Sequence, residues 1–183
     1  MRLRAATPAD AAAIAGIYAP YVTDSIVSFE TEPPTPEEVR ARIEAAQGLY
    51  PWIVAADDDE AVAGYAYATS FRARAAYRFT VETSVYLAPA AKRRGLGGRL
   101  YQALLATLEA QGFAQAIGVV TLANQASIAL HERLGFEAAG VYRDVGWKVG
   151  GWHSVGLWQR RLAPATVSPT EPKPVDEVGL RLV

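Results

Sequence analysis

One stretch, residues 80–105, restricts the possible folds of this chain most strongly. From Thr80 to Leu87 apolar and polar residues alternate as in a half-buried β-strand, and beyond it leucines recur at helical spacing. A basic, glycine-rich turn, Lys92 to Gly98, joins the two parts. A strand that passes through such a turn into a helix presents backbone N–H groups without intrahelical partners, and the helix dipole adds positive potential. We therefore expect a phosphate or pyrophosphate to bind at this junction.

The glycine turn matches neither of two common nucleotide-binding patterns. A P-loop needs lysine directly after its last glycine and Ser or Thr next, whereas Gly97-Gly98 is followed by Arg99-Leu100. The dinucleotide fingerprint G-x-G-x-x-G is present only in its first half, Gly95-Leu96-Gly97. What remains is basic-x-x-Gly-x-Gly, a spacing that a solvated basic loop could also show.

Composition narrows the chemistry further. The chain has 183 residues, which suits one domain, and it has no cysteine, which excludes disulfides and a cysteinyl acyl-enzyme. Its two histidines lie far apart, so we expect no metal site. The net charge of −1 gives no general basic field for nucleic acid. Neither a signal peptide nor an apolar run of about 20 residues is found, so we expect a cytoplasmic protein without membrane attachment.

The order of the expected elements predicts an α/β (α+β) fold around one sheet. The sheet should be mostly antiparallel early in the chain and parallel near the glycine turn. Helices should open at Thr7-Pro8 and Thr35-Pro36, where capping residues precede helical spacing. The proline-rich residues 163–183 suggest a tail outside a packed domain of residues 1–162. The other expected strands are 3–6, 52–56, 61–71, 115–122, 136–142 and 147–162, the last two linked around 143–146, and a short helix is expected at 124–134.

The motifs resemble those of the GNAT N-acetyltransferases. That family has Arg/Gln-x-x-Gly-x-Gly/Ala at a strand–helix junction, and residues 92–97 differ only by lysine at the first position. A second family element matches at 124–136, so the resemblance covers roughly residues 2–162. Residues 80–86, 130–136 and 145–148 are similar to the phosphinothricin and methionine sulfone/sulfoximine N-acetyltransferase branch. That branch usually has histidine where this chain has Thr83.

The resemblance implies acetyl-CoA as the acetyl donor and a central, mostly antiparallel mixed sheet that splays at the cofactor strand. Backbone groups freed by the splay would pair with the pantetheine amides, and the glycine turn would wrap the pyrophosphate. Asn124 and Ser127 on the later helix would also face the cofactor. The cofactor-binding residues implied in this way are Val85, Tyr86, Leu87, Arg93, Arg94, Gly95, Leu96, Gly97, Gly98, Asn124 and Ser127.

Glu82 is the candidate general base. Along a strand Glu82, Ser84 and Tyr86 share one face, and a carboxylate there could take a proton from an ammonium directly or through water. Burial would raise its pKa toward a useful range. The alternative is a structural ion pair with an arginine of the segment 72–78.

His131 is the second catalytic candidate. On a helix it would share a face with Asn124 and Ser127, and by resemblance it stands where many GNAT enzymes place a tyrosine that protonates the departing thiolate. A packed or solvent-facing histidine is the alternative.

Arg72, Ala73, Arg74 and Tyr77 precede the cofactor strand in a basic, irregular segment that suits an anionic, amino-acid-like acceptor, although each could also belong to a solvated loop. With them we predict Glu82, Thr83, Ser84 and His131 at the acceptor site; weaker candidates for its wall are Phe29, Glu30 and Lys148.

The sequence therefore predicts an acetyl-CoA-dependent N-acetyltransferase acting on a small amino-acid-like amine by direct attack in a ternary complex, without a metal. Alternatives are another amine, such as a polyamine or a protein N-terminus, a non-catalytic acyl-CoA sensor, or a nucleotide-binding module. Trp147, Trp152 and Trp158 suggest packing or contacts within a homodimer.

Overall fold

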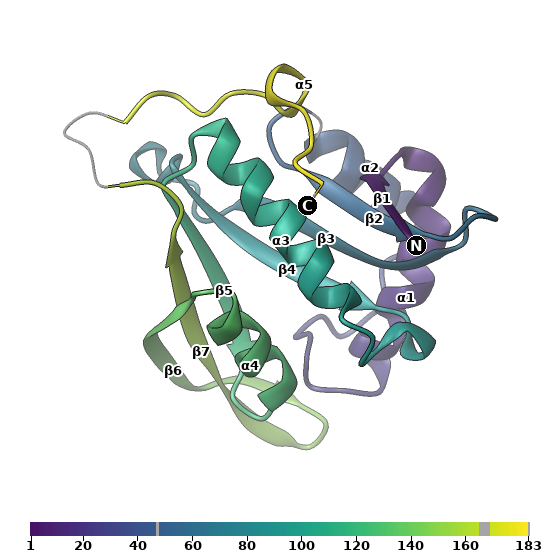
Figure 1. Cartoon of the computed structure of the whole chain (residues 1–183). Coiled ribbons are helices and arrows are strands. Elements are labelled where there is room, and N and C mark those ends of the chain that lie inside the picture. Colours follow the sequence, from purple (N-terminus) through teal and green to yellow (C-terminus); the bar gives the residue numbers. More distant parts are fainter. Residues whose placement is uncertain (47, 165–168, 183) are drawn as a thin grey trace.

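A seven-stranded mixed sheet forms the centre of the protein (Figure 1). The computed structural model describes residues 1–46, 48–164 and 169–182. Within them the strand order is β1-β2-β3-β4-β5-β7-β6, and only β4 and β5 pair in parallel, which confirms the predicted mixed, mostly antiparallel sheet. The strands are β1 Arg2–Ala5, β2 Trp52–Ala56, β3 Val62–Ser70, β4 Thr80–Leu87, β5 Gln115–Thr121, β6 Glu137–Lys148 and β7 Gly151–Arg161.

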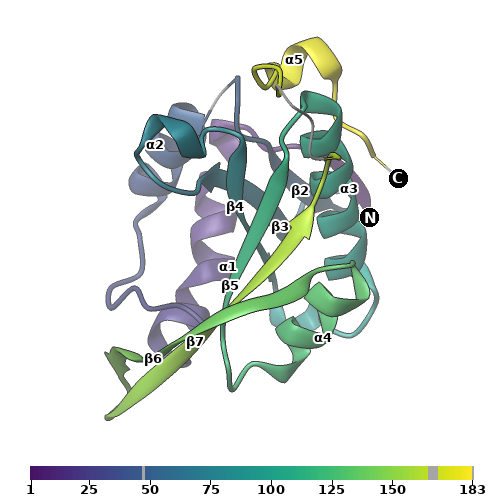
Figure 2. The same ribbon diagram turned by 90° about the vertical axis from the view of Figure 1, so that its left-hand side faces the viewer.

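Helices cover the sheet on both faces (Figures 1 and 2). On one face α3 (Leu96–Gln111) buries Leu100, Leu104 and Leu108 completely, as the predicted leucine stripe requires. On the other face α1 (Ala11–Thr23) and α2 (Pro36–Ala46) form a second core with the aromatic residues of β2 and β3. The remaining helix of the packed part, α4 (Gln125–Arg133), follows β5, as its predicted position requires.

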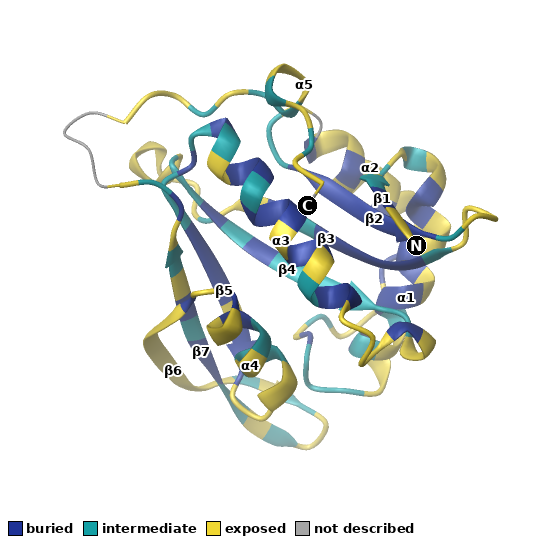
Figure 3. Ribbon diagram, in the orientation of Figure 1, coloured by how far each residue is buried: buried dark blue, intermediate teal, exposed yellow. Residues whose placement is uncertain are grey.

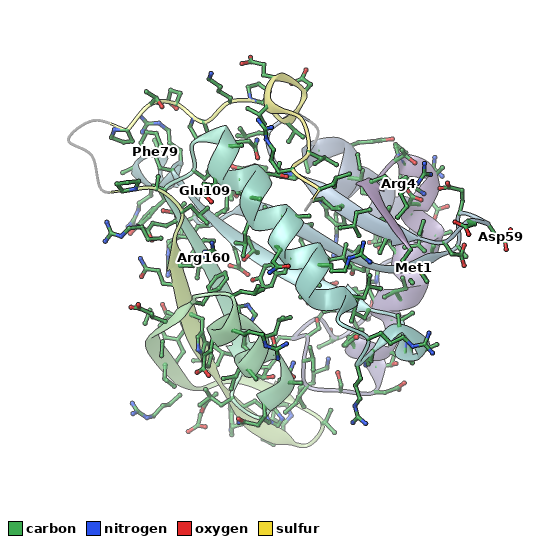
Figure 4. All side chains as sticks on the ribbon, in the orientation of Figure 1. Met1, Arg4, Asp59, Phe79, Glu109 and Arg160 are labelled. Atoms are coloured by element: carbon green, nitrogen blue, oxygen red, sulfur yellow. The ribbon has the colours of Figure 1, made fainter. Side chains whose placement is uncertain are left out.

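Local capping explains where the first helices begin. The Thr35 N–H donates to Glu38 Oε2 at 2.7 Å and the Glu38 N–H donates to Thr35 Oγ1 at 3.2 Å, which is the predicted capping box. At the other start, Asp10 in a short 3-10 turn (η1, Pro8–Asp10) accepts a bond from the Thr7 N–H at 2.7 Å. Arg4, on the outer strand β1 (Figure 4), donates both ends of its guanidinium to the same buried carboxylate.

The sheet opens between β4 and β5. The two strands pair only over 80–82 of β4 and 115–117 of β5, although β4 continues to Leu87 and β5 to Thr121. Beyond Glu82 the backbones of the two strands diverge. The splay expected at the cofactor strand is therefore present.

The last two strands differ from the prediction. We expected them to be joined around 143–146, but β6 runs through this segment and the turn lies at Val149 and Gly150. Both turn residues have positive φ, 49° and 71°, as a two-residue hairpin turn requires. The segment 143–146 is instead a β-bulge, marked by a register shift between Tyr142 and Gly146. Most of β6 is exposed (Figure 3).

The proline-rich tail contacts the domain. The Lys173 N–H donates to the carbonyl oxygen of Gln111 at 2.8 Å, and the Gln111 side chain donates to the carbonyl oxygen of Lys173. Arg78 forms an ion pair with Glu171, and a short helix, α5 (Val175–Val178), follows. The described part of the tail thus lies against α3 rather than apart from the domain, while 165–168 and 183 lie outside the described residues. The division at 162 stays a prediction.

Candidate functional site

A cleft of about 480 Å³ lies where β4, β5 and the N-termini of α3 and α4 meet. It contains the strand opening and the glycine turn, so the sequence features that were predicted to bind one cofactor are brought together. Residues of both sheet faces reach it, because the opening passes between the strands. Its predicted members are Thr83, Ser84, Val85, Tyr86, Leu87, Arg93, Gly95, Leu96, Gly97, Gly98, Asn124, Ser127 and His131.

The glycine turn has the backbone geometry of an anion site. Arg93 and Gly95 adopt positive φ values of 63° and 76°, and α3 begins directly after them at Leu96. The first N–H groups of a helix have no intrahelical acceptors, so those of Leu96, Gly97 and Gly98 are available to a ligand. A Cβ added to Gly98 would meet nothing within 4 Å, which leaves the helix start open for close approach. Arg94, also predicted here, is exposed and does not line the cleft.

At the far end of β4, Tyr21 of α1 occupies the edge of the opening. Its hydroxyl donates to the carbonyl oxygen of Leu87 at 2.7 Å and lies 3.4 Å from the Leu87 nitrogen. The ammonium of Lys92 sits 4.6 Å from the centre of the Tyr21 ring. Tyr21 therefore connects the cofactor strand to the basic turn. These parts of the chain are far apart in the sequence, so no local sequence pattern predicts the contact.

Thr121, at the end of β5, lines the cleft and was not predicted. Its side chain is 3% exposed, and its Oγ1 has no hydrogen-bond partner within the part of the chain that the structure describes. A buried hydroxyl without a partner is costly, so this atom fits a ligand that supplies one. An amide-bearing arm such as pantetheine has suitable donors and acceptors, and the residues present therefore fit acetyl-CoA.

His131 is buried in a hydrogen-bonded chain. Its Nδ1 lies 2.8 Å from the Ser127 carbonyl oxygen, which can only accept, so Nδ1 carries the proton. Its Nε2 then accepts from the Tyr101 hydroxyl at 2.9 Å, and Tyr101 contacts Thr83 Oγ1 at 2.7 Å. Burial lowers the pKa of His131 and so favours the neutral ring. A Cβ on Gly118 would overlap the imidazole, so the ring requires glycine at that position.

Glu82 lies in a half-buried position at the last paired residue of β4. Burial raises the pKa of Glu82, while the charge of Arg72 acts in the opposite direction. None of the ion pairs among the described residues involves Glu82, and Arg78 pairs with Glu171 instead. Burial thus shifts the pKa of Glu82 in the direction that suits a general base.

The two catalytic candidates lie on opposite sides of the sheet at β4, Glu82 on the strand itself and His131 on α4. Glu82 shares its face with Tyr86, which packs edge-to-face against Tyr18 and Tyr21 of α1. Thr83 faces the other way, toward Tyr101 of α3 and thus toward His131. The opening between β4 and β5 joins these two sides, so a molecule that passes through it can meet both groups.

The predicted acceptor segment lies outside the cleft. Arg72, Ala73, Arg74 and Tyr77 are exposed and do not line it, and neither does Glu82. Arg72 is the member connected to the site, through its charge on Glu82 and a 3.3 Å bond from Nη2 to the Tyr142 hydroxyl.

Several lining residues were missed by sequence reasoning. Those on β5 could have been inferred, because the partner of a splayed strand must face the same opening. Those from α1 and the loop after it carry no local signal, since they reach the site only through tertiary packing. The missed residues are Tyr21, Val27, Val119, Val120, Thr121, Ala126, Leu130 and Arg133, while Lys92, the first residue of the predicted anion-binding turn, also lines the cleft.

No group of three or more histidine, aspartate or glutamate residues among those that the structure describes could hold a metal ion. None of the helices in 1–46, 48–164 and 169–182 is long and apolar enough to cross a membrane.

Comparisons with known proteins agree with this geometry. The model of the acetyltransferase (GNAT) family matches residues 17–136. A phosphinothricin N-acetyltransferase of Streptomyces viridochromogenes is 46% identical over 173 residues, 94% of each chain. An L-methionine sulfoximine/L-methionine sulfone acetyltransferase of Pseudomonas paraeruginosa is 36% identical, over 91% of this chain and 98% of that one.

Among solved structures, the phosphinothricin acetyltransferase of Sinorhizobium meliloti in complex with acetyl-CoA superposes with a TM-score of 0.87, at 41% identity and 94% coverage of both chains. The sheet opening, the glycine turn and these similarities lead to one conclusion: the chain belongs to the GNAT family of acetyltransferases.

Proposed function

We propose that this protein transfers the acetyl group of acetyl-CoA to the amine of a small amino-acid-like substrate of the phosphinothricin or methionine sulfone/sulfoximine type. The observation that carries the proposal is the cleft, in which a parallel strand opening and a helix N-terminus after a basic glycine turn lie together. The names of relatives that cover nearly the whole chain support the substrate class.

Acetyl-CoA, when bound, supplies a thioester as the acetyl donor. The turn at Arg93–Gly98 would hold its pyrophosphate, and the freed backbone of β4 with Thr121 would hold the amide-bearing arm. Holding both substrates in one site lowers the entropic cost of their reaction. Because the chain has no cysteine, we propose direct attack by the amine rather than transfer through a cysteinyl intermediate.

Glu82 is the proposed general base. Its raised pKa suits acceptance of a proton from the substrate ammonium, directly or through one water molecule, at the face of β4 where the opening begins. Arg72, whose charge reaches Glu82, would attract the anionic groups of the acceptor. Arg74, Ala73 and Tyr77 remain candidates on the same segment.

We propose that His131 passes a proton to the leaving thiolate only after its Nε2 has taken one up, because the neutral ring keeps its single proton on Nδ1, against the Ser127 carbonyl oxygen. Since its Nε2 accepts from Tyr101 in the structure, His131 would act together with that hydroxyl rather than alone. Thr83 and Ser84, on either face of β4, line the cleft beside it.

We also propose a homodimer. The edge strand β6 and its hairpin expose Trp147 and Trp152, which are 59% and 61% exposed, and an exposed apolar patch of this kind favours an interface. Trp158, in contrast, is buried in the core. Analytical ultracentrifugation of the wild type and of Trp147→Glu tests this, because a dimer held by the patch should dissociate in the variant.

A thiol-release assay with acetyl-CoA tests the function. Phosphinothricin, L-methionine sulfone and L-methionine sulfoximine should release thiol, while spermidine and a peptide N-terminus should not. Tight binding of acetyl-CoA without acetylation of any amine would favour a non-catalytic sensor instead. Preference for a polyamine would contradict the acceptor assignment.

A further inference from the structure

Tyr21 of α1 occupies the edge of β4 that faces the strand opening. On the other edge, the Ala88 N–H donates to the Ala63 carbonyl oxygen, next to β3, at 2.9 Å. Backbone groups of consecutive residues in a strand point to opposite edges, so those of Leu87 and Val85 point toward the opening. The Tyr21 hydroxyl donates to the carbonyl oxygen of Leu87 and accepts from its N–H. The groups of Val85, from which β5 has diverged, stay open to a ligand.

The ring of Tyr21 lies beside the basic turn, which Figure 1 shows next to α1. Lys92, the first residue of that turn, places its ammonium 4.6 Å from the centre of the ring, and an aromatic face attracts a cation at this distance. Lys92 is exposed and takes part in none of the ion pairs that the described residues form. A neutral ring, which leaves the positive charge intact for an anion, thus holds Lys92 at the cleft.

The position of Tyr21 is itself fixed by packing. Its ring packs edge-to-face on Tyr86 with the ring centres 5.1 Å apart, and Tyr86 makes a second contact of this kind with Tyr18. After the end of α1, the Ser25 hydroxyl donates to the Tyr21 carbonyl oxygen at 2.8 Å. A side chain that packing already holds in one place can position a cation at little further entropic cost.

We propose that Tyr21 is a positioning residue for acetyl-CoA: its ring holds Lys92 for the pyrophosphate, and its hydroxyl closes Leu87, which leaves Val85 to pair with the pantetheine arm. One side chain thereby separates the part of β4 that receives the arm from the turn that receives the anion. The inference rests on the proposed function, because it takes acetyl-CoA as the donor. It does not depend on which amine accepts the acetyl group.

The role of Lys92 is tested by calorimetry with two probes, acetyl-CoA and ADP, which carries a pyrophosphate without the arm. Lys92→Met should weaken binding of both probes by about tenfold and reduce the dependence of affinity on salt, because one charged contact is lost. Lys92→Arg should lose far less affinity, since a guanidinium also stacks on an aromatic face. Arg99→Met is the matched control, because Arg99 is exposed, follows the same turn and does not line the cleft. An equal loss in Arg99→Met and Lys92→Met would show an effect of general charge only and would overturn the inference.

Two variants of Tyr21 separate the ring from the hydroxyl. Tyr21→Phe keeps the ring but leaves the groups of Leu87 open, so it should weaken acetyl-CoA binding by about threefold without weakening ADP binding. Tyr21→Leu should weaken ADP binding about as much as Lys92→Met does, and it should have no further effect on ADP in the Lys92→Met background. Circular-dichroism melting establishes that each variant is folded, and where Tyr21→Leu is not, Lys92→Met and Tyr21→Phe still decide the two parts.

Three results would count against the proposals. Equal ADP affinity in Tyr21→Leu and the wild type, or additive losses in the double variant, would overturn the role of the ring. Unchanged acetyl-CoA affinity in Tyr21→Phe would overturn the role of the hydroxyl. A wild type that does not bind acetyl-CoA would instead refute the proposed function, so the two kinds of failure are distinguishable.

Discussion

The close contact between the His131 ring and the backbone of Gly118 leads to a stability prediction. In Gly118→Ala the new Cβ would lie 2.5 Å from Cδ2 of the imidazole, which is 4% exposed and held by Tyr101 and Ser127. The ring must move, and overpacking of this kind costs about 1–3 kcal/mol. Losing a hydrogen bond of the buried chain adds about 1–3 kcal/mol. Together, about 2–6 kcal/mol of lost stability lowers Tm by roughly 4–24 °C, at about 2–4 °C per kcal/mol in a domain of this size.

Calorimetric or circular-dichroism melting checks this figure against Gly140→Ala, which should stay within about 0.5 kcal/mol of the wild type. Removing the imidazole should relieve the overlap, so Gly118→Ala combined with His131→Ala should be no less stable than His131→Ala alone. If Gly118→Ala has the same Tm as Gly140→Ala, the imidazole does not lie against Gly118, and its Nδ1–H is not fixed on the Ser127 carbonyl oxygen.

Three further outcomes follow from the structure. Asp10→Asn should lower the free energy of unfolding by about 2 kcal/mol at pH 7. Because Arg4 lowers the pKa of Asp10 below its usual 3.8, the wild-type advantage is present above that pH and disappears as pH falls through the lowered pKa, which acid titration of Tm measures. Gly97→Val should weaken acetyl-CoA binding by about tenfold, as measured by calorimetry. A Cβ at Gly97 would already lie 3.4 Å from Leu87, and the two methyl groups of valine would crowd the start of α3. Unchanged acetyl-CoA affinity would contradict this prediction. Burial raises the pKa of Glu82, so the contribution of Glu82 to stability is present at low pH and is lost as pH rises through that pKa. Glu82→Gln should therefore have a higher Tm than the wild type at pH 7 but not at pH 4. An equal difference in Tm at both pH values would refute the direction of this pKa shift.

Structural features that depend on residues close together in the sequence were predictable. The capping box of Thr35 and Glu38 and the leucine stripe of α3 depend on spacing alone, and both are present. The glycine turn was recognisable because positive φ at Gly95 and an open helix start need residues without side chains.

Features that depend on distant residues were not predictable. The chain from Thr83 through Tyr101 to His131 joins β4, α3 and α4, and no single element shows it. The hairpin turn was misplaced because Arg143–Gly146 has turn-like composition, whereas the actual turn begins at Val149, a residue that rarely adopts positive φ. The position of the turn follows from the pairing of β6 with β7, in which Lys148 lies opposite Gly151, and not from the turn preference of the residues themselves.

The central claim is that Glu82 accepts the amine proton in an acetyl transfer that uses the cleft between β4 and β5. The most direct measurement is the rate of thiol release from acetyl-CoA with L-methionine sulfone, for the wild type and Glu82→Gln, across pH. The account predicts a turnover about 10²–10⁴-fold lower in the variant, loss of the acidic limb of the wild-type profile, and unchanged acetyl-CoA affinity. Equal turnover and an identical pH profile in the two proteins would contradict it.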